Sequence, residues 1–504
     1  MHKRGTISGI ALLLMLAVLS PAQAESVLRI GLTSDPDMLD PSQARTFTGR
    51  TVFAGLCDKL VDISPELDIV PQLATEWHWT DGGKGLVMKL RPGVKFHDGE
   101  PFNAAAVKYS LKRHLTLPGS TRRSEISVVK DVEIVDDLTV KLVLSEPSAP
   151  LLAQLSDRAG MIVSPKAAEA EGDKFADHPV CAGPYKFVKR VAQDRIVLER
   201  FADYWNKDAI HFDKIIYLPI PDSTVRLANL MSGGLDIAEN IAAADYDRLA
   251  GDSRVKLSQI TGLGYETVRI NTNNGDLAKK PMGADPRVRE AFELAIDRTA
   301  LNQVVFNGHM MPGNQFMPPN NPYYAKEYPI PARDVEKAKK LLAAAGQPHP
   351  TVAMLVPNSP EVLQAAQVLQ SMVAEAGFDL QLQSVEANTA TSLARDGKYE
   401  TYITYWSGRI DPDGNIYNFA ACKGPLNDSH YCNPEVDKEL NAARVSQAPA
   451  ERVSHYAKVT GDLIKDRPMI YLWHLSWLWA ASPKLAGFSP YPDGLIRPQG
   501  LRLQ

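Results

Sequence analysis

Helical and strand-like segments alternate over residues 285–480, and few fold classes are built in this way. Asp285-Pro286 opens one predicted helix, Asp334 caps a second, and residues 361–376 are predicted to form a third. Short alternating stretches that follow or adjoin these helices are predicted as strands, over residues 351–355, 379–385 and 402–406. Helices that alternate with strands predict an α/β lobe for this part of the chain.

The first half of the chain is richer in strands and hairpins. Residues 27–32 alternate and end at turn residues, so they are predicted to form a strand, and residues 132–144 to form a hairpin. Residues 51–61 carry apolar positions at helical spacing. Residues 86–96 are predicted as two strands separated by a Pro-Gly turn.

The length of the chain predicts more than one lobe, because 504 residues exceed the size at which single hydrophobic cores stop growing. The proline-containing end, residues 487–503, is expected to return and pack on the first lobe. A chain that visits lobe one, lobe two and lobe one again leaves a cleft crossed by two connections. Such a cleft closes by hinge bending.

The N-terminus has the three parts of a secretory signal. Lys3 and Arg4 are basic, residues 10–19 are apolar, and Ala22-Gln23-Ala24 is a small-x-small cleavage pattern. The apolar run is shorter than the roughly 20 residues of a transmembrane helix, which disfavours an uncleaved anchor. We expect cleavage after Ala24 and, because no cysteine lies at the cleavage point, a free periplasmic protein rather than a lipidated one.

Charge and cysteine usage exclude some classes of partner. The 55 basic and 59 acidic residues are well mixed and give a net charge of −4, which argues against nucleic acid. Cys422 and Cys432 enclose a polar turn-forming loop and are predicted to form a disulfide. Cys57 and Cys181 lie in apolar surroundings, where a bridge and buried free thiols are both open. No His or Cys pair has zinc-ligand spacing, so neither a metal site nor a cofactor is expected.

Enzymatic motifs are missing from the sequence. There is no Gly-x-Ser-x-Gly elbow, no His-Glu-x-x-His helix and no phosphate-cradling loop. We therefore expect a binding protein rather than an enzyme.

A series of short motifs extends along nearly the whole chain after the signal. In order they are Leu39-Asp40-Pro41, Phe53-Ala54-Gly55-Leu56, Pro71-Gln72-Leu73-Ala74, Leu90-Arg91-Pro92-Gly93-Val94-Lys95-Phe96-His97-Asp98-Gly99, Gly183-Pro184-Tyr185, Asp203-Tyr204-Trp205, Gly234-Leu235-Asp236-Ile237, Asp285-Pro286-Arg287-Val288-Arg289 and Ala295-Ile296-Asp297-Arg298. In this set the chain resembles the family 5 extracellular solute-binding proteins of ABC transporters, which include dipeptide-, oligopeptide- and nickel-binding members.

The resemblance implies an α/β, two-lobed periplasmic binding protein with a discontinuous first lobe and an extra subdomain. The first lobe would comprise residues 25–55, 165–268 and 480–504, and the inserted subdomain residues 56–164. The second lobe would comprise residues 269–479.

The resemblance also implies a function, namely binding of di- or oligopeptides between the lobes and their delivery to membrane permeases and, through them, to ATPase subunits. A monomer is expected. The alternatives are an anionic non-peptide solute, such as a glutathione-like compound, an opine or a sugar-phosphate conjugate, and, with less support, a nickel complex. A binding protein that signals rather than feeds an importer would have the same fold.

The loop Trp406-Ser407-Gly408-Arg409-Ile410-Asp411 is the first candidate for ligand contact. In related peptide binders an acidic residue directly after the small pair holds the ligand's ammonium group, whereas here Arg409 has that position. A guanidinium pairs with carboxylate or phosphate instead. Asp411 would take the amine-binding role if the loop is shifted, and a salt bridge from Arg409 to Asp411 or Asp413 is the structural alternative.

Thr46, Phe47 and Thr48 form the second candidate. In the family this region faces the cleft, where hydroxyl groups and an aromatic face suit a polar ligand. A helix cap at Thr48 is the structural alternative. The dipeptide binders carry an arginine for the ligand carboxylate where this chain has Asn358, so both charge anchors of a dipeptide differ here.

Overall fold

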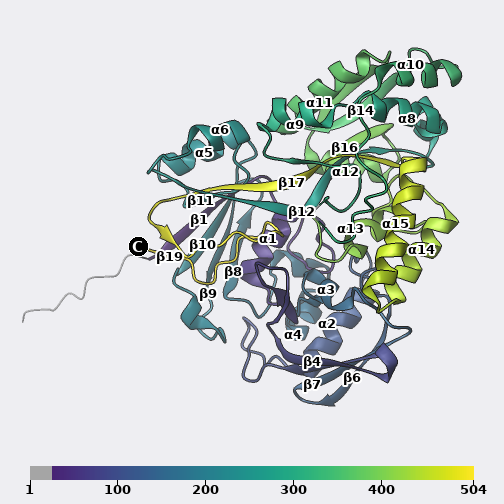
Figure 1. The fold of residues 1–504 in the computed structure, drawn as a ribbon. Helices are drawn as coiled ribbons and strands as arrows, with labels where there is room; N and C mark the ends of the chain where they lie inside the picture. Colours follow the sequence, from purple (N-terminus) through teal and green to yellow (C-terminus); the bar gives the residue numbers. More distant parts are fainter. Residues whose placement is uncertain (1–24, 320) are drawn as a thin grey trace, which may run out of the picture.

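The computed structural model describes residues 25–319 and 321–504, and Figure 1 shows an α/β protein with two lobes. The predicted signal, residues 1–24, lies outside the described residues. Most strands belong to one large sheet: β1 (Val27–Leu32), β8 (Tyr185–Val191), β9 (Arg195–Arg200), β10 (Lys214–Pro219), β11 (Ile237–Ala238), β12 (Lys256–Ile270), β13 (Met311–Pro312), β14 (Thr351–Pro357), β15 (Asp379–Val385), β16 (Thr401–Trp406) and β17 (Met469–Ala481).

The remaining strands form smaller sheets. Four of them belong to the segment predicted as an insert: β4 (Ala74–Thr80), β5 (Gly85–Leu90), β6 (Val129–Asp136) and β7 (Thr139–Leu144). Two short pairs are β2 (Val61–Ile63) with β3 (Ile69–Pro71), and β18 (Leu485–Ala486) with β19 (Arg502–Leu503).

Helices cover the sheets on both sides (Figure 1). The α-helices are α1 (Phe47–Leu56), α2 (Ala104–Thr116), α3 (Leu151–Leu155), α4 (Pro165–Glu171), α5 (Ser223–Met231), α6 (Ala243–Arg248), α7 (Pro281–Ala284), α8 (Pro286–Leu294), α9 (Arg298–Phe306), α10 (Val335–Ala344), α11 (Pro360–Ala374), α12 (Ala387–Arg395), α13 (Asp413–Ala420), α14 (Pro434–Val445) and α15 (Pro449–Asp466). Short 3-10 helices are η1 (Asp81–Gly83), η2 (Arg158–Gly160), η3 (Gly172–Asp177), η4 (Lys207–Ala209) and η5 (Asp276–Lys279).

The long strands β12 and β17 join the two lobes. The large sheet has the order β15-β14-β16-β12-β17-β11-β1-β10-β9-β8, with β13 beside β17. The β12–β17 pair is antiparallel, and its register shifts between Thr261 and Tyr265. These two strands are the two connections that the sequence predicts across the cleft.

The first lobe collects segments from both ends of the chain. Leu28 and Ile30 of β1 pack in one buried cluster with Phe53 of α1, and Ile496 and Leu501 belong to the same cluster. The C-terminal segment therefore returns to the first lobe. The residue boundaries predicted for the lobes stay a prediction.

Two elements differ from the sequence prediction. The helix expected over residues 51–61 begins earlier, at Phe47, because the Thr46 side chain accepts a hydrogen bond from the Gly49 amide. It ends at Leu56, since Cys57 is extended and bonded to Cys181. The second strand expected within residues 86–96 is a loop, in which Lys95 makes only an isolated bridge to Pro101.

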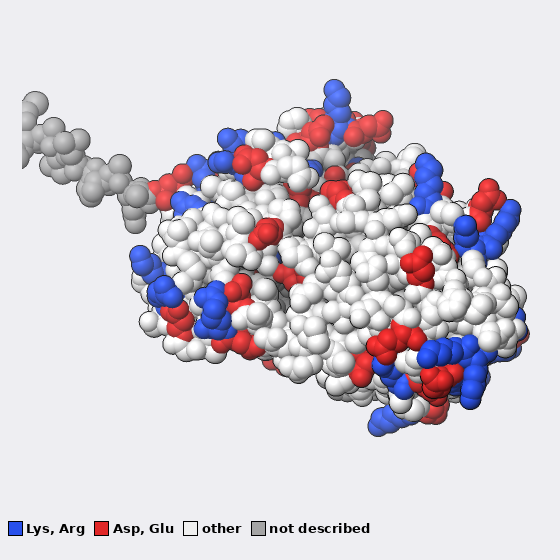
Figure 2. Space-filling view, turned by 90° about the horizontal axis from the view of Figure 1, so that it is seen from above, with Lys and Arg blue, Asp and Glu red and all other residues white. Residues whose placement is uncertain are grey.

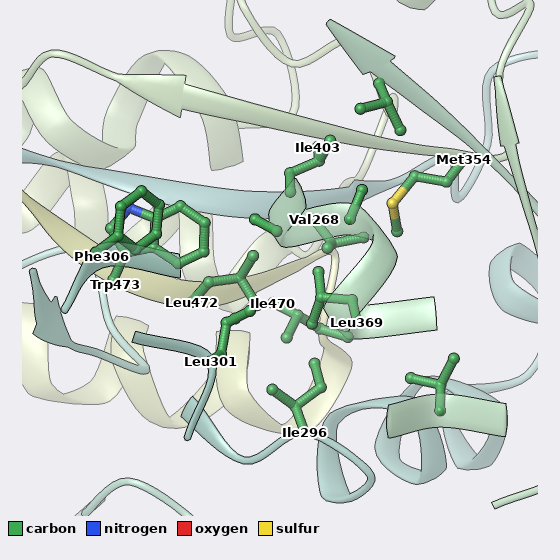
Figure 3. Packing of buried hydrophobic residues seen from close by; sticks show 14 of the residues in the cluster. Val268, Ile296, Leu301, Phe306, Met354, Leu369, Ile403, Ile470, Leu472 and Trp473 are labelled. Atoms are coloured by element: carbon green, nitrogen blue, oxygen red, sulfur yellow. The ribbon is translucent and has the colours of Figure 1, made fainter. Parts of the chain in front are cut away.

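The core of the second lobe is apolar and closely packed (Figure 3). Val268 and Ile403 come from neighbouring strands, Leu369 from a covering helix, and Phe306 packs on Trp473 with ring centroids 4.8 Å apart. Burying each such side chain stabilises the fold by about 1.5–3 kcal/mol. This core gives the loop after β16 a rigid base.

Charged side chains of both signs are interspersed on the surface. Figure 2 shows them around the rim of one face, whose middle is largely uncharged. This face carries no continuous basic stripe of the kind that binds nucleic acid.

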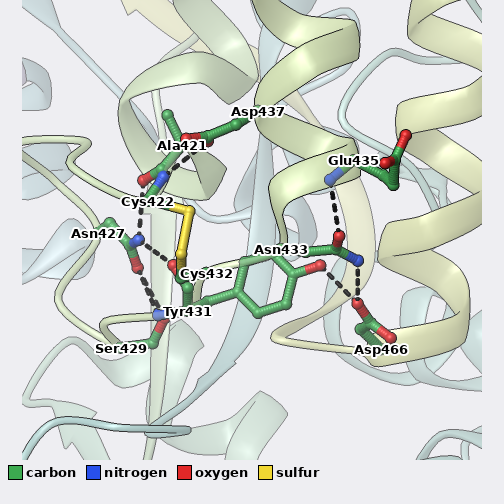
Figure 4. The surroundings of a disulfide bond; sticks show 10 residues. All are labelled: Ala421, Cys422, Asn427, Ser429, Tyr431, Cys432, Asn433, Glu435, Asp437 and Asp466. Atoms are coloured by element: carbon green, nitrogen blue, oxygen red, sulfur yellow. Dashed lines mark hydrogen bonds between the residues drawn. A yellow bond between two sulfur atoms is a disulfide. The ribbon is translucent and has the colours of Figure 1, made fainter.

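Both cysteine pairs are disulfide-bonded. Cys422 is joined to Cys432, and Asn427 inside this loop donates to the Ala421 and Tyr431 carbonyls at 2.9 and 2.6 Å (Figure 4). The pair Cys57 and Cys181, for which the sequence leaves a bridge and free thiols open, is also bridged, with Cα atoms 4.9 Å apart. The second bridge connects residues 124 positions apart, at the end of α1 and before β8.

Candidate functional site

The loop after β16 crosses β12 at very close range. Gly408 has φ 84° and makes an isolated parallel bridge with Leu263. A Cβ atom on Gly408 would lie 2.2 Å from the Leu263 carbonyl carbon, and one on Gly264 would lie 1.9 Å from the Trp406 oxygen. Only glycine fits at such a crossing. The turn at Gly408 directs Arg409 toward the first lobe.

We expect Gly408→Ala to destabilise the protein by about 1–3 kcal/mol more than Gly251→Ala, because overpacking adds to the cost of a positive φ. Gly251 is a matched control, since its φ is 85° and nothing lies within 4 Å of its Cβ position. Urea denaturation of both variants measures the difference. Equal stability losses would show that the backbone crossing is loose.

Arg409 binds across the cleft. Its Nε lies 2.6 Å from Oδ2 of Asp157, and its Nη1 donates to the Gly408 carbonyl at 2.7 Å. The guanidinium also lies over the Trp406 ring, 4.4 Å from its centroid. Its buried Nη2 has no hydrogen-bond partner among the described residues. Burial and the neighbouring Arg50 lower the pKa of Arg409 to about 10, so the group stays cationic at neutral pH.

The structural alternative for Arg409, a salt bridge to Asp411 or Asp413, is wrong. Asp411 receives Nη2 of Arg452 on both carboxylate oxygens, at 2.7 and 2.9 Å. Asp413 pairs with Arg444 at 2.6 Å. Both acidic residues therefore pair with arginines on helices of the second lobe, α14 and α15. Arg409 pairs with Asp157 instead.

The surroundings of Asp157 carry an excess of positive charge. Besides Arg409, Arg50 of α1 places its Nε 3.1 Å from Asp157, and Nε of Arg158 lies 3.8 Å away. Although burial opposes ionisation, these three arginines hold the pKa of Asp157 well below its usual range. With Arg122, which pairs with Glu125, four guanidinium groups stand against two carboxylates. Such a cluster attracts an anion.

The sequence did not single out Arg50 or Asn415. Nη1 of Arg50 donates to Ser407 Oγ at 3.2 Å, so first and second lobe meet there. Asn415 of α13 accepts from the Arg409 amide at 2.7 Å and from Nε1 of Trp406 at 3.0 Å. The only sequence signal for Arg50 was a lone arginine on an otherwise uncharged, mostly apolar helix.

The candidate residues before α1 serve its N-terminus. Thr46 donates to Oδ1 of Asp37 at 2.8 Å and caps the helix. The cap therefore lies two residues before Thr48, where the structural alternative placed it. Phe47 stacks on Trp477 with centroids 4.6 Å apart. Thr48 is buried, and its hydroxyl lies 3.3 Å from that of Ser34, just after β1. Their contact with a ligand stays a prediction.

Trp406 and Tyr405 point in different directions. Trp406 packs on Phe419 of α13, with ring centroids 4.9 Å apart. Tyr405, its neighbour on β16, keeps 43% of its surface exposed. Burial and the carboxylates of Glu239 and Glu266 raise the pKa of Tyr405, and Arg50 also acts on it. Ser407 lies two residues further along and contacts Arg50 of the first lobe, so the exposed Tyr405 lies beside the junction of the lobes.

Direct contacts hold the lobes together. Nε2 of Gln154 donates to Oδ2 of Asp413 at 3.0 Å, and Oγ of Ser124 donates to Oδ1 of Asn418 at 3.0 Å. A pocket that is partly open to solvent lies at this junction. Its lining comes from both lobes: Glu125, Ala153, Gln154, Asp157, Trp406, Arg409, Asp411, Asp413, Gly414 and Asn418.

Neither metal chemistry nor a membrane span is evident in the part of the chain that the structure describes. There, no three His, Cys, Asp or Glu side chains are grouped to hold a metal ion. Within residues 25–319 and 321–504, no helix has the length and apolar character needed to cross a membrane.

Comparison with known proteins gives a consistent family. Residues 68–427 match the model of the bacterial extracellular solute-binding proteins, family 5 (middle part). The glutathione-binding protein GsiB of Pectobacterium atrosepticum is 30% identical over 492 residues, which cover 95% of this chain and 94% of that protein.

Solved structures share the fold. The periplasmic binding protein AgaA from A. tumefacien R10, in complex with agropinic acid, has a TM-score of 0.85 and 27% identity and covers 95% of this chain and 99% of its own. The dipeptide-binding protein of Pseudoalteromonas sp. SM9913, in complex with Met-Leu, has a TM-score of 0.88 at 22% identity, with 95% of this chain and all of its own covered. These neighbours confirm the predicted two-lobed α/β architecture. The chain therefore belongs to family 5 of the extracellular solute-binding proteins, the periplasmic components that work with the permeases and ATPases of ABC importers.

Proposed function

We propose that this protein binds an acidic, peptide-like solute of the glutathione class between its lobes and delivers it to an ABC permease. The excess of guanidinium groups around Asp157 carries this proposal. A carboxylate of the ligand would bind Nη2 of Arg409, which is buried and without a partner among the described residues. A buried cation without a full set of acceptors gains most from an anionic ligand.

The relatives support an acidic ligand. The relative from Pectobacterium atrosepticum is named for glutathione, and the structural neighbour AgaA holds agropinic acid. The arginine cluster gives a reason for preferring such a ligand to a neutral dipeptide, since the resemblance implies an acidic residue in peptide binders where this chain has Arg409. Opines are the second candidate, on the likeness to AgaA.

Binding would act by closure. A ligand that contacts Arg50 on one lobe and Arg409 on the other favours the closed arrangement, because it gains both contacts only there. The residues Gln154, Asp413, Ser124 and Asn418 would then add their direct contacts. No covalent bond changes in this cycle.

Calorimetric titration with three probes tests the proposal. Reduced glutathione is expected to bind with a dissociation constant of about 1 μM or below, a free energy of about −8 kcal/mol. Agropinic acid tests the opine alternative, and trialanine is the neutral control. Binding of trialanine as tightly as glutathione would contradict an acidic ligand class.

A further inference from the structure

Arg409 cannot accept a hydrogen bond from an amino group on the ligand. The resemblance to the family implies an acidic residue for such a group at this position. Asp411, the nearest substitute in sequence, has both carboxylate oxygens bonded to Arg452. An ammonium group on the ligand therefore needs another carboxylate in the cleft.

Glu266 is a buried carboxyl group with little to bind. It lies on β12 directly opposite Tyr405 of β16, so the two side chains share one face of the sheet. Only 4% of Glu266 is exposed, and its Oε1 has no hydrogen-bond partner among the described residues. A buried, unpartnered polar group of this kind calls for an explanation, such as a ligand.

Glu239 presents a second carboxylate from the other lobe. It follows β11, where that strand lies parallel to β1, and the carboxyl ends of such strands are the usual place for ligands in open sheets. Thr33 donates to Oε1 of Glu239 through its amide at 2.7 Å and its hydroxyl at 3.1 Å. Oε2 is buried and has no partner in the described part of the chain.

Tyr405 connects Glu266 with the arginine cluster. Ser407 lies two residues after Tyr405, on the same side of the extended chain, and its Oγ accepts from Nη1 of Arg50 at 3.2 Å and from Nη1 of Arg409 at 3.5 Å. Glu266, the exposed Tyr405 and the two arginines therefore lie on one side of β16. A carboxyl group and two guanidinium groups on one side suit a zwitterion.

We propose that Glu266 binds the primary ammonium group of the ligand, with Glu239 of the first lobe as a second acceptor, while Arg409 and Arg50 bind a carboxylate. This inference rests on the proposed function and narrows it. The ligand class becomes an amino acid derivative or short peptide with a free α-amino group and at least one further carboxylate. Glu266 is then a specificity-determining residue.

Ligand binding at Glu266 is coupled to the release of a proton from its carboxyl group. Burial, only partly offset by Arg269, raises the pKa of Glu266 to about 8, so the free protein holds it mainly protonated at pH 7. The ammonium group stabilises the ionised form, so binding releases close to one proton at pH 7, and affinity rises from pH 6 to pH 8.

The charged and titratable groups around Glu266 and Tyr405 are Arg269 on the same strand, Tyr402 and Tyr405 on β16, Glu239 after β11, Arg50 on α1 and His474 on β17. Burial lowers the pKa of His474 to about 4, which keeps it neutral, and both tyrosines have raised pKa values. Glu239 also has a raised pKa from burial, which its two Thr33 donors oppose. The Glu239→Gln variant measures the contribution of Glu239 to proton release separately.

The experiment compares reduced glutathione with its N-acetylated form, which lacks the ammonium group, by calorimetry in two buffers of different ionisation enthalpy. The proteins are the full mature chain, Glu266→Gln, Glu239→Gln and the control Glu400→Gln. Glu400 is a matched control, because it is equally buried but accepts from the Ala353 amide away from Tyr405. Thermal melts establish that each variant is folded.

We expect the unmodified protein to prefer glutathione over the N-acetylated form by at least 10-fold and to release about one proton. Glu266→Gln should lose both the preference and the proton release, and Glu239→Gln should reduce the preference, while Glu400→Gln changes neither. A Glu266→Gln protein that keeps both would overturn the inference and leave the proposed function standing. Failure of the unmodified protein to bind either probe would overturn the proposed function and the inference with it.

Discussion

Arg409→Asp is expected to raise the dissociation constant for an acidic ligand by at least about 30-fold. Removing one partner of a buried charge pair costs about 2–5 kcal/mol, and each 1.4 kcal/mol is a factor of ten. The new carboxylate would also face Asp157, which the native Arg409 contacts at 2.6 Å. Calorimetric titration with glutathione gives the change in affinity.

Arg254→Asp provides the control for this variant. Arg254 is exposed and pairs with Asp252 near the surface, so its replacement should leave ligand affinity within about twofold. Arg409→Lys keeps the charge but loses the fork of donors, and we expect an intermediate loss. Unchanged affinity in Arg409→Asp, with an intact thermal melt, would remove Arg409 from the ligand site.

Loss of the Cys57–Cys181 bridge should have the largest effect on stability. Its ends are 124 residues apart, against 10 for Cys422–Cys432, and a longer loop gains more from a cross-link. Chain entropy predicts a loss of about 5 kcal/mol for Cys57→Ala with Cys181→Ala, and of about 3 kcal/mol for the other pair. The midpoints of urea denaturation measure both.

The two double variants, one for each disulfide, serve as controls for each other. Ligand affinity should change little in either, because neither disulfide lines the pocket between Asp157 and Arg409. If the Cys422–Cys432 variant loses as much stability as the Cys57–Cys181 variant, loop length does not govern the stabilisation. Destabilisation by local packing at Asn427 would then be the better explanation.

Local sequence signals predicted the positions of helices and strands better than the contacts between distant segments. Asp285 and Asp334 cap α8 and α10 as the sequence predicts, and the predicted strand over residues 379–385 coincides with β15. These features depend on neighbours within a few residues. The predicted helix over residues 51–61 extends past the end of α1, because Cys57 is extended and bonded to the distant Cys181.

The site was harder to predict, because its contacts join distant segments. Arg409 was identified, but its partner Asp157 lies in the insert and Arg50 in the first helix, so no spacing rule connects them. In the sequence, Glu266 is one polar residue in a strand that contains both polar and apolar side chains. Its importance follows only from the register that places it opposite Tyr405 and from its burial.

Native mass spectrometry of the mature protein, purified from its periplasm and followed by gentle release of its ligand, tests the acidic ligand class most directly. The arginine cluster at Asp157 predicts one or a few small compounds that carry at least two carboxylates, and Glu266 predicts a free amino group on them. A heterogeneous set of neutral or basic peptides would contradict this account and return Arg409 to a purely structural role.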